Sequence, residues 1–361
     1  MDEQRLLSGR ILGALASRDH FGGNSVGNRP KPLLHSYISS SAVRRRYTSA
    51  QALLPLKQPR QIEAKCFEGV IELPSMGYLH APEITRSRTV LVDLLPVPRV
   101  VSPKISSGHV PPIIVSREIE VLERIPAAYR LLFWGGNPRA RVSQLSGGHW
   151  RLRWAFSLLE KISILSLLRD VTASILLFCG SDKNSFYDPR AHGTVFIRFT
   201  KANDEFHLLE EFVHQAGHAL FYILTLQPKR YSHIPERAPI CSLGVGSSDT
   251  RPFGVALHGL VTEALIADAF FRIYSLPSMS ATDRHQALGR LAFSTRKLAA
   301  DLHLIAGLSE KFTGEGLVLL GAISRTCSRI FRQFGARLER VDLSGQGYVF
   351  SPKRYAAVNK D

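Results

Sequence analysis

The segment from Asp204 to Leu226 constrains the fold of this chain more than any other. Its apolar residues recur at spacings of three and four, which places them on one face of a helix. Acidic residues occupy its first turn, where the helix dipole favours them, and Pro228 follows as a stop signal. We therefore expect a long amphipathic helix over 204–226 that packs on a hydrophobic core.

The same segment carries His214 and His218, four positions apart and so on one face of the helix. The apolar stripe is centred near Leu209, and the two histidines lie about 140° and 180° away from it. They share their face with Glu211. Random placement of 13 histidines in 361 residues predicts 13 × 13/361, roughly 0.5, such pairs. Two neutral imidazoles at this spacing suit Zn²⁺ or Fe²⁺. The alternative is a pair of exposed histidines on a solvated face.

A third metal ligand has to come from outside this helix. The long connection 228–252 leads to another helix, expected over 253–275, with His258 near its start. His258 is our first choice, and Glu263 and Asp268 are alternatives on the same helix. They do not point together, because His258 lies about 140° from Glu263 and about 80° from Asp268 around the axis. The other interpretation of His258 is a capped or exposed side chain.

Gln215 decides which chemistry the pair can support. In a zinc peptidase the HExxH glutamate deprotonates metal-bound water, and such a base typically contributes about 10²–10⁴-fold. The amide of Gln215 cannot accept that proton. A non-haem Fe(II) oxygenase instead needs three ligands and open positions, and Gln215 could orient its substrate or co-substrate. Gly217, between the histidines, would let another group approach closely.

The rest of the chain predicts an α+β fold. We expect a small β-sheet backed by a helical metal-binding domain that carries a zincin-like HxxxH helix, preceded by a mixed α/β region. The domains expected are 1–149, 150–341 and a C-terminal tail, 342–361. The expected strands are 61–73, 89–95, 112–116, 173–179 and 194–200. The further expected helices are 2–17, 117–134, 150–168, 281–308 and 315–340, and the tail from Asp342 is expected as strand or coil.

Charge and cysteine usage indicate the compartment and the kind of partner. The net charge is +16, which favours acidic partners. No helix-turn-helix, zinc-finger or RNP pattern accompanies that charge, so specific nucleic-acid binding is not expected. Four cysteines without a CxxC unit suit a reducing cytosol. The acidic N-terminus lacks an apolar signal region, and the apolar stretch 154–180 is broken by charges, so we expect a cytoplasmic protein without a membrane span.

Two stretches of the sequence are similar to a known family. They are FVHQAGH at 212–218, and DTRPFGVALHG at 249–259. Together they resemble the HExxH-motif peptide-modification proteins of bacterial natural-product gene clusters, also described as 2-oxoglutarate-dependent peptide β-hydroxylases. The resemblance covers about 190–275, roughly a quarter of the chain. The sequence departs from the family pattern at Gln215, where glutamate is usual, and at Thr250, where proline is expected.

This resemblance implies Fe(II) held by His214, His218 and His258, with 2-oxoglutarate as co-substrate. It also implies a ribosomal precursor peptide as substrate, whose acidic leader would suit the positive charge of residues 1–149. Arg251 would bind the distal carboxylate of 2-oxoglutarate, because a guanidinium matches a carboxylate in a bidentate way; its alternative is an ordinary surface arginine in a turn. Two further alternatives are a zinc hydrolase with an unusual base and a catalytically impaired homologue that binds metal or peptide.

Overall fold

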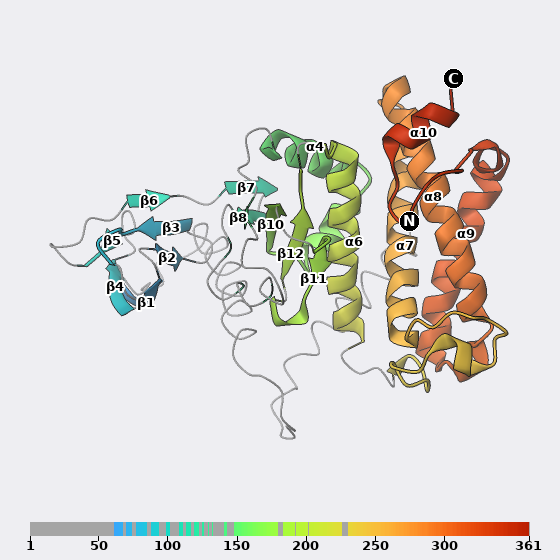
Figure 1. The fold of residues 1–361 in the computed structure, drawn as a ribbon, viewed down its shortest axis with the longest axis horizontal. Helices are drawn as coiled ribbons and strands as arrows, with labels where there is room; N and C mark the ends of the chain where they lie inside the picture. The colour runs from blue at the N-terminus through green and yellow to red at the C-terminus, as the bar shows by residue number, and fades with distance from the viewer. Residues whose placement is uncertain are drawn as a thin grey trace. The chain divides into compact units, whose positions relative to one another are not determined.

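In a computed structural model, residues 230–360 are described without a break, together with most of 141–225 and shorter stretches between 61 and 132. The expected helix 2–17 lies outside the described residues. The described chain forms two compact units (Figure 1). The sheet unit falls within 61–153 and 169–203, and the helical unit falls within 154–168 and 204–360. The expected boundary at 149/150 lies near Arg153–Trp154, where the described chain passes between units, but residues 169–203 then return to the sheet unit.

The first sheet of the sheet unit is antiparallel, with strand order β5-β4-β1-β2-β3-β6. Its strands are β1 (Gln61–Phe67), β2 (Val70–Leu73), β3 (Gly77–His80), β4 (Arg88–Asp93), β5 (Arg99–Val100) and β6 (Gly108–Val110). The run expected as one strand over 61–73 is thus a hairpin, in which Phe67 pairs with Val70. The expected strand 89–95 corresponds to β4.

The second sheet has the order β11-β12-β10-β8-β7, with β9 also paired to β10. Its strands are β7 (Ile113–Ser116), β8 (Ile119–Leu122), β9 (Arg141–Val142), β10 (Ser174–Cys179), β11 (Phe186–Tyr187) and β12 (Thr194–Arg198). The three central strands β8, β10 and β12 are parallel. A central parallel strand is buried on both faces, which explains the unbroken apolar run SILLFC in β10. Phe178 and Phe196 pack with Tyr129 in the core of this sheet.

The helical unit contains α6 (Glu205–Leu224), α7 (Phe253–Tyr274), α8 (Ala281–Ala306), α9 (Gly314–Arg340) and α10 (Pro352–Val358). It also contains most of α4 (Gly148–Lys161) and α5 (Leu165–Arg169), namely the parts that fall within residues 154–168. α6 packs on α4 through Phe212 and Phe156, whose ring centroids are 4.7 Å apart. At its start, the carboxylate of Asp204 accepts the His207 N–H at 2.6 Å and so caps the first turn. The expected helices over 204–226, 253–275, 281–308 and 315–340 are confirmed.

α7 lies between α6, α8 and α9. Of the helices that the structure describes, it is the one long and apolar enough to cross a membrane, but 67% of that apolar window is buried inside the protein. Its apolar side chains, among them Leu260, Ala267 and Phe270, are fully buried. A core helix of this kind meets the same criteria as a membrane span, so its hydropathy is weak support for one.

Besides the run 61–73, three secondary-structure predictions were wrong. The helix expected over 117–134 begins instead as strand β8, because Ile119 and Val121 are buried where β8 pairs with β7 and β10. The helix expected over 150–168 is broken between α4 and α5, where Ser163 adopts φ 61°. The tail forms α10, which Ser351 caps by accepting from the Arg354 N–H. The mixed α+β fold class is confirmed.

Candidate metal site

The predicted metal ligands lie at the contact between α6 and α7. A Cβ built on Gly217 would lie 3.0 Å from Leu265 Cδ1 and 3.2 Å from Thr262 Cγ2, both on α7. The absence of a side chain at Gly217 therefore lets the two helices approach closely. The group that approaches this glycine is α7 itself, which brings His258 beside the histidine pair of α6.

The three histidines form a row with His218 in the middle. The Nε2 atoms of His214 and His218 are 3.1 Å apart. On its other side, Nδ1 of His218 faces Nδ1 of His258 at 3.5 Å, and the two rings are nearly parallel with centroids 5.7 Å apart. The His258 ring is held edge-on against Phe221, with centroids 4.6 Å apart. All three side chains are half-buried, unlike a pair on a solvated face.

Burial keeps these imidazoles neutral. Desolvation, together with smaller contributions from charge repulsion by His214 and His258, lowers the pKa of His218 to about 3. Desolvation also lowers the pKa of His258 to about 4. The pKa of His214 is lowered chiefly by burial, opposed by the charges of Glu211 and Glu210. A neutral imidazole has a lone pair for a metal ion, so these groups are in the protonation state that ligation requires.

Gln215 is 3% exposed, and its Oε1 atom has no hydrogen-bond partner among the described residues. On α6 it is rotated by about 100° from His214. A buried carbonyl oxygen without a partner costs free energy comparable to a lost hydrogen bond. The amide oxygen of Gln215 is thus an acceptor without a donor, directly after His214 in the sequence.

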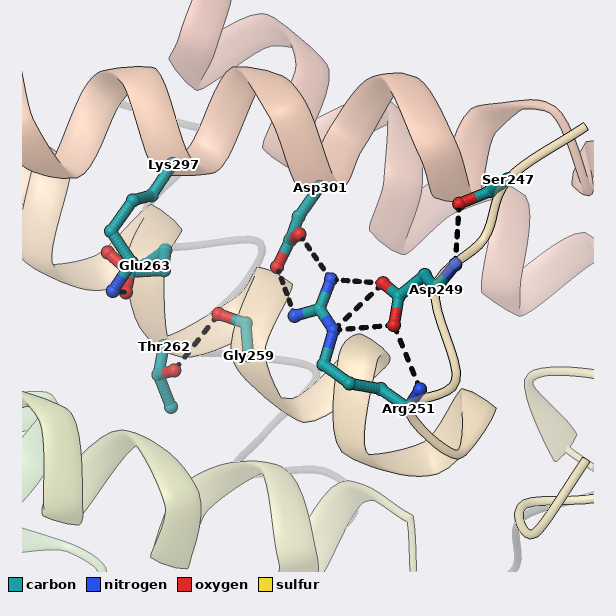
Figure 2. A network of polar contacts seen from close by, with 8 residues as sticks. All are labelled: Ser247, Asp249, Arg251, Gly259, Thr262, Glu263, Lys297 and Asp301. Atoms are coloured by element: carbon teal, nitrogen blue, oxygen red, sulfur yellow. Dashed lines mark hydrogen bonds and ion pairs between the residues drawn. The ribbon is translucent and has the colours of Figure 1, made fainter. Parts of the chain in front are cut away.

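Arg251 lies between two carboxylates, as Figure 2 shows. Its guanidinium binds Asp249 at 2.7 Å and Asp301 of α8 at 2.7 Å. These two carboxylates raise the pKa of Arg251 well above its ordinary value. The guanidinium N–H groups of Arg251, which the resemblance assigns to 2-oxoglutarate, therefore donate to two carboxylates of the chain itself.

The two alternative ligands on α7 are also paired. Glu263 is buried and forms an ion pair with Lys297 of α8 (Figure 2). Asp268 accepts from Arg272 at 2.8 Å and from Arg329 at 2.5 Å. In the part of the chain that the structure describes, neither carboxylate forms a hydrogen bond or ion pair with the histidines.

The donor set fits a metal ion in part. Two imidazole nitrogens 3.1 Å apart match neighbouring positions on one ion with metal–nitrogen bonds of about 2.0–2.1 Å. His258, however, faces the opposite nitrogen of His218. Across the described residues, no group of three or more His, Cys, Asp and Glu side chains is arranged to hold an ion. His214 and His218 are thus the two histidines whose Nε2 atoms lie close enough together to bind one ion.

The sequence did not reveal a second polar cluster, between α6 and α8. Arg290 is 2% exposed and binds Glu210 and Asp204 of the α6 region, while Gln286 binds Asp204 at 2.5 Å. The available signal was Asp204, just before the first turn of α6, where the helix dipole alone already explains an acidic residue. No periodicity argument pairs that turn with an arginine eighty residues later.

Comparison with known proteins adds no assignment. No family model matches this chain, and a search of curated proteins gave no match.

Proposed function

We propose that this protein is a metal-dependent enzyme of the oxygenase type, whose ion is bound by His214 and His218. The observation that supports this best is the 3.1 Å separation of their Nε2 atoms. Because burial keeps both imidazoles neutral, no proton has to leave before an ion binds. The proposed reaction is the Fe(II)/2-oxoglutarate-dependent hydroxylation of a side chain in a ribosomal precursor peptide.

Gln215 favours oxygen chemistry over hydrolysis. When bound, Fe(II) and 2-oxoglutarate would supply the oxidising chemistry. The residues of the chain would bind the ion, orient the substrate and exclude water. His214 and His218 would hold the ion, and the unpartnered Oε1 of Gln215, which is 3% exposed, would accept from a substrate amide N–H only after a local rearrangement uncovers it. A hydrolase would need a base at this position, which an amide is not.

The peptide part of the proposal rests on charge and on the resemblance stated above. A net charge of +16 favours an acidic leader segment. We propose that residues 1–149 recruit the peptide; within this range the structure describes strands β1 to β9 and a few residues outside them.

The experiment uses metal and 2-oxoglutarate alone as probes. Protein loaded with Fe(II) without oxygen should bind one equivalent, and oxygen should then release succinate slowly even without peptide. The His218→Ala variant should lose the metal, whereas His303→Ala, at an exposed position of α8, should keep it. Metal-loaded wild-type protein that binds no 2-oxoglutarate would refute the oxygenase proposal.

One observation favours a second candidate function. Arg251, the residue predicted to bind 2-oxoglutarate, already forms ion pairs with Asp249 and Asp301. We therefore propose as the alternative a metal- or peptide-binding homologue without oxygenase activity. It predicts stoichiometric metal with no succinate. A gain of peptide cleavage with Zn²⁺ in Gln215→Glu would instead favour the zinc hydrolase.

A further inference from the structure

His218 uses both of its ring nitrogens. Nε2 faces His214, and Nδ1 faces His258 of the neighbouring helix. The two contacts lie on opposite edges of one imidazole ring. His214 and His218 would therefore hold an ion through their Nε2 atoms, and His258 faces the other ring nitrogen of His218.

The chemistry of imidazole then assigns the protons. A neutral ring carries one N–H and one lone pair, so ligation through Nε2 places the hydrogen of His218 on Nδ1. In metal sites that second N–H almost always donates to a carboxylate, a carbonyl or water, which fixes the orientation of the ring. Here the group opposite Nδ1 is Nδ1 of His258. A neutral His258 accepts that hydrogen bond when its own proton is on Nε2.

His258 is placed for this task by its surroundings. Phe221, one turn after His218 on α6, contacts the His258 ring edge-on. The contact of Gly217 with Thr262 and Leu265 sets the spacing of the two helices.

We propose that His258 is a positioning residue that orients His218 and fixes its tautomer, and is not a ligand of the ion. This inference rests on the proposed metal site. It leaves His214 and His218 as the imidazole ligands, so that more positions on the ion are open to co-substrate and solvent than in a three-histidine site.

The test is nitrogen NMR of the full chain with ¹⁵N-labelled histidine, loaded with Zn²⁺ as a diamagnetic probe. We expect two metal-bound Nε2 signals, a protonated Nδ1 on His218, and a His258 ring that is neutral and unligated. Three metal-bound imidazoles would overturn the inference while supporting the metal site. A protein that binds no Zn²⁺ at all would overturn the proposed site itself.

Variants give an independent readout. His258→Phe keeps a ring against Phe221 but removes the acceptor, and should weaken Zn²⁺ binding about 10–100-fold while retaining one equivalent. His258→Gln restores an acceptor oxygen and should recover most of the affinity. The Co²⁺ absorption spectrum should keep its shape in His258→Phe, because the ligand set is unchanged. A changed spectrum, or loss of stoichiometric binding in a variant that folds, would contradict the inference.

Discussion

Gly217 of α6 lies directly against Thr262 of α7, so that a Cβ on the glycine would be 3.2 Å from Thr262 Cγ2. This close approach explains how His258 comes to lie beside His218. The histidine row therefore depends on a residue that has no functional group of its own.

A larger residue at 217 should separate the helices. We expect Gly217→Val to destabilise the protein by about 1–3 kcal/mol, as overpacking typically does. Urea unfolding measures this. The matched control is Gly335→Ala in α9, where the nearest contact of the added Cβ is 3.9 Å away, and which should stabilise by about 0.5–1 kcal/mol. Equal effects of the two substitutions would contradict this role of Gly217.

Arg290→Met should be severely destabilising. The substitution leaves Glu210 and Asp204 without their partner, and breaking a buried ion pair costs about 3–5 kcal/mol. Adding Glu210→Gln should recover part of the loss. Arg190→Met, which breaks a surface pair with Asp188, should cost about 1 kcal/mol or less. Chemical denaturation of the four proteins compares these values.

The metal-free protein should lose stability as the pH falls below about 6.5, the ordinary pKa of histidine. Burial lowers the pKa of His218 to about 3 and that of His258 to about 4, so from pH 6.5 down to 4 only the unfolded chain binds these protons. The free energy of unfolding then falls by at most about 1.4 kcal/mol per pH unit for each histidine. Urea midpoints at pH 7, 6 and 5 with a chelator measure the slope. The double variant His218→Phe/His258→Phe should reduce this slope.

Lys297→Met should make stability fall with rising pH. Burial raises the pKa of Glu263 and Lys297 opposes that effect, so removal of the lysine raises this pKa further. A carboxyl group whose folded pKa exceeds its unfolded value stabilises the fold at low pH and loses that contribution as the pH rises. We expect a loss of about 1–3 kcal/mol by pH 8. In Lys297→Met/Glu263→Gln the added pH dependence should vanish; its persistence would exclude Glu263 as the source.

The sequence predicted the long helices within a few residues, because each has strong periodicity and clear ends. Thr313 and Ser280 cap α9 and α8 as such residues commonly do. It failed at β8, a four-residue strand whose conformation is set by partners on both sides. Local propensity does not encode such pairing. It also missed α10, although Ser351 followed by Pro352 is a recognisable helix start.

For the site, helix periodicity placed His214 and His218 on one face, and their Nε2 atoms are indeed adjacent. Which nitrogen of His218 faces His258 could not be predicted, because it depends on ring rotation and on the spacing of α6 and α7. The partners of Arg251 were equally hidden. Asp301 lies fifty residues further along the chain, and only the packing of α8 on α7 brings it near.

The C-terminal tail closes the helical unit. A Cβ on Gly289 of α8 would be 2.7 Å from Tyr355 and 2.8 Å from Phe350. These two side chains of the tail therefore pack directly on the backbone of α8. Phe350 also covers buried Arg290, 5.0 Å from its ring. During synthesis, α6 and α8 therefore leave the ribosome well before the segment that completes their packing. A nascent or prematurely terminated chain would expose Arg290 and its carboxylate partners, and would be a natural target for chaperones and quality-control proteases.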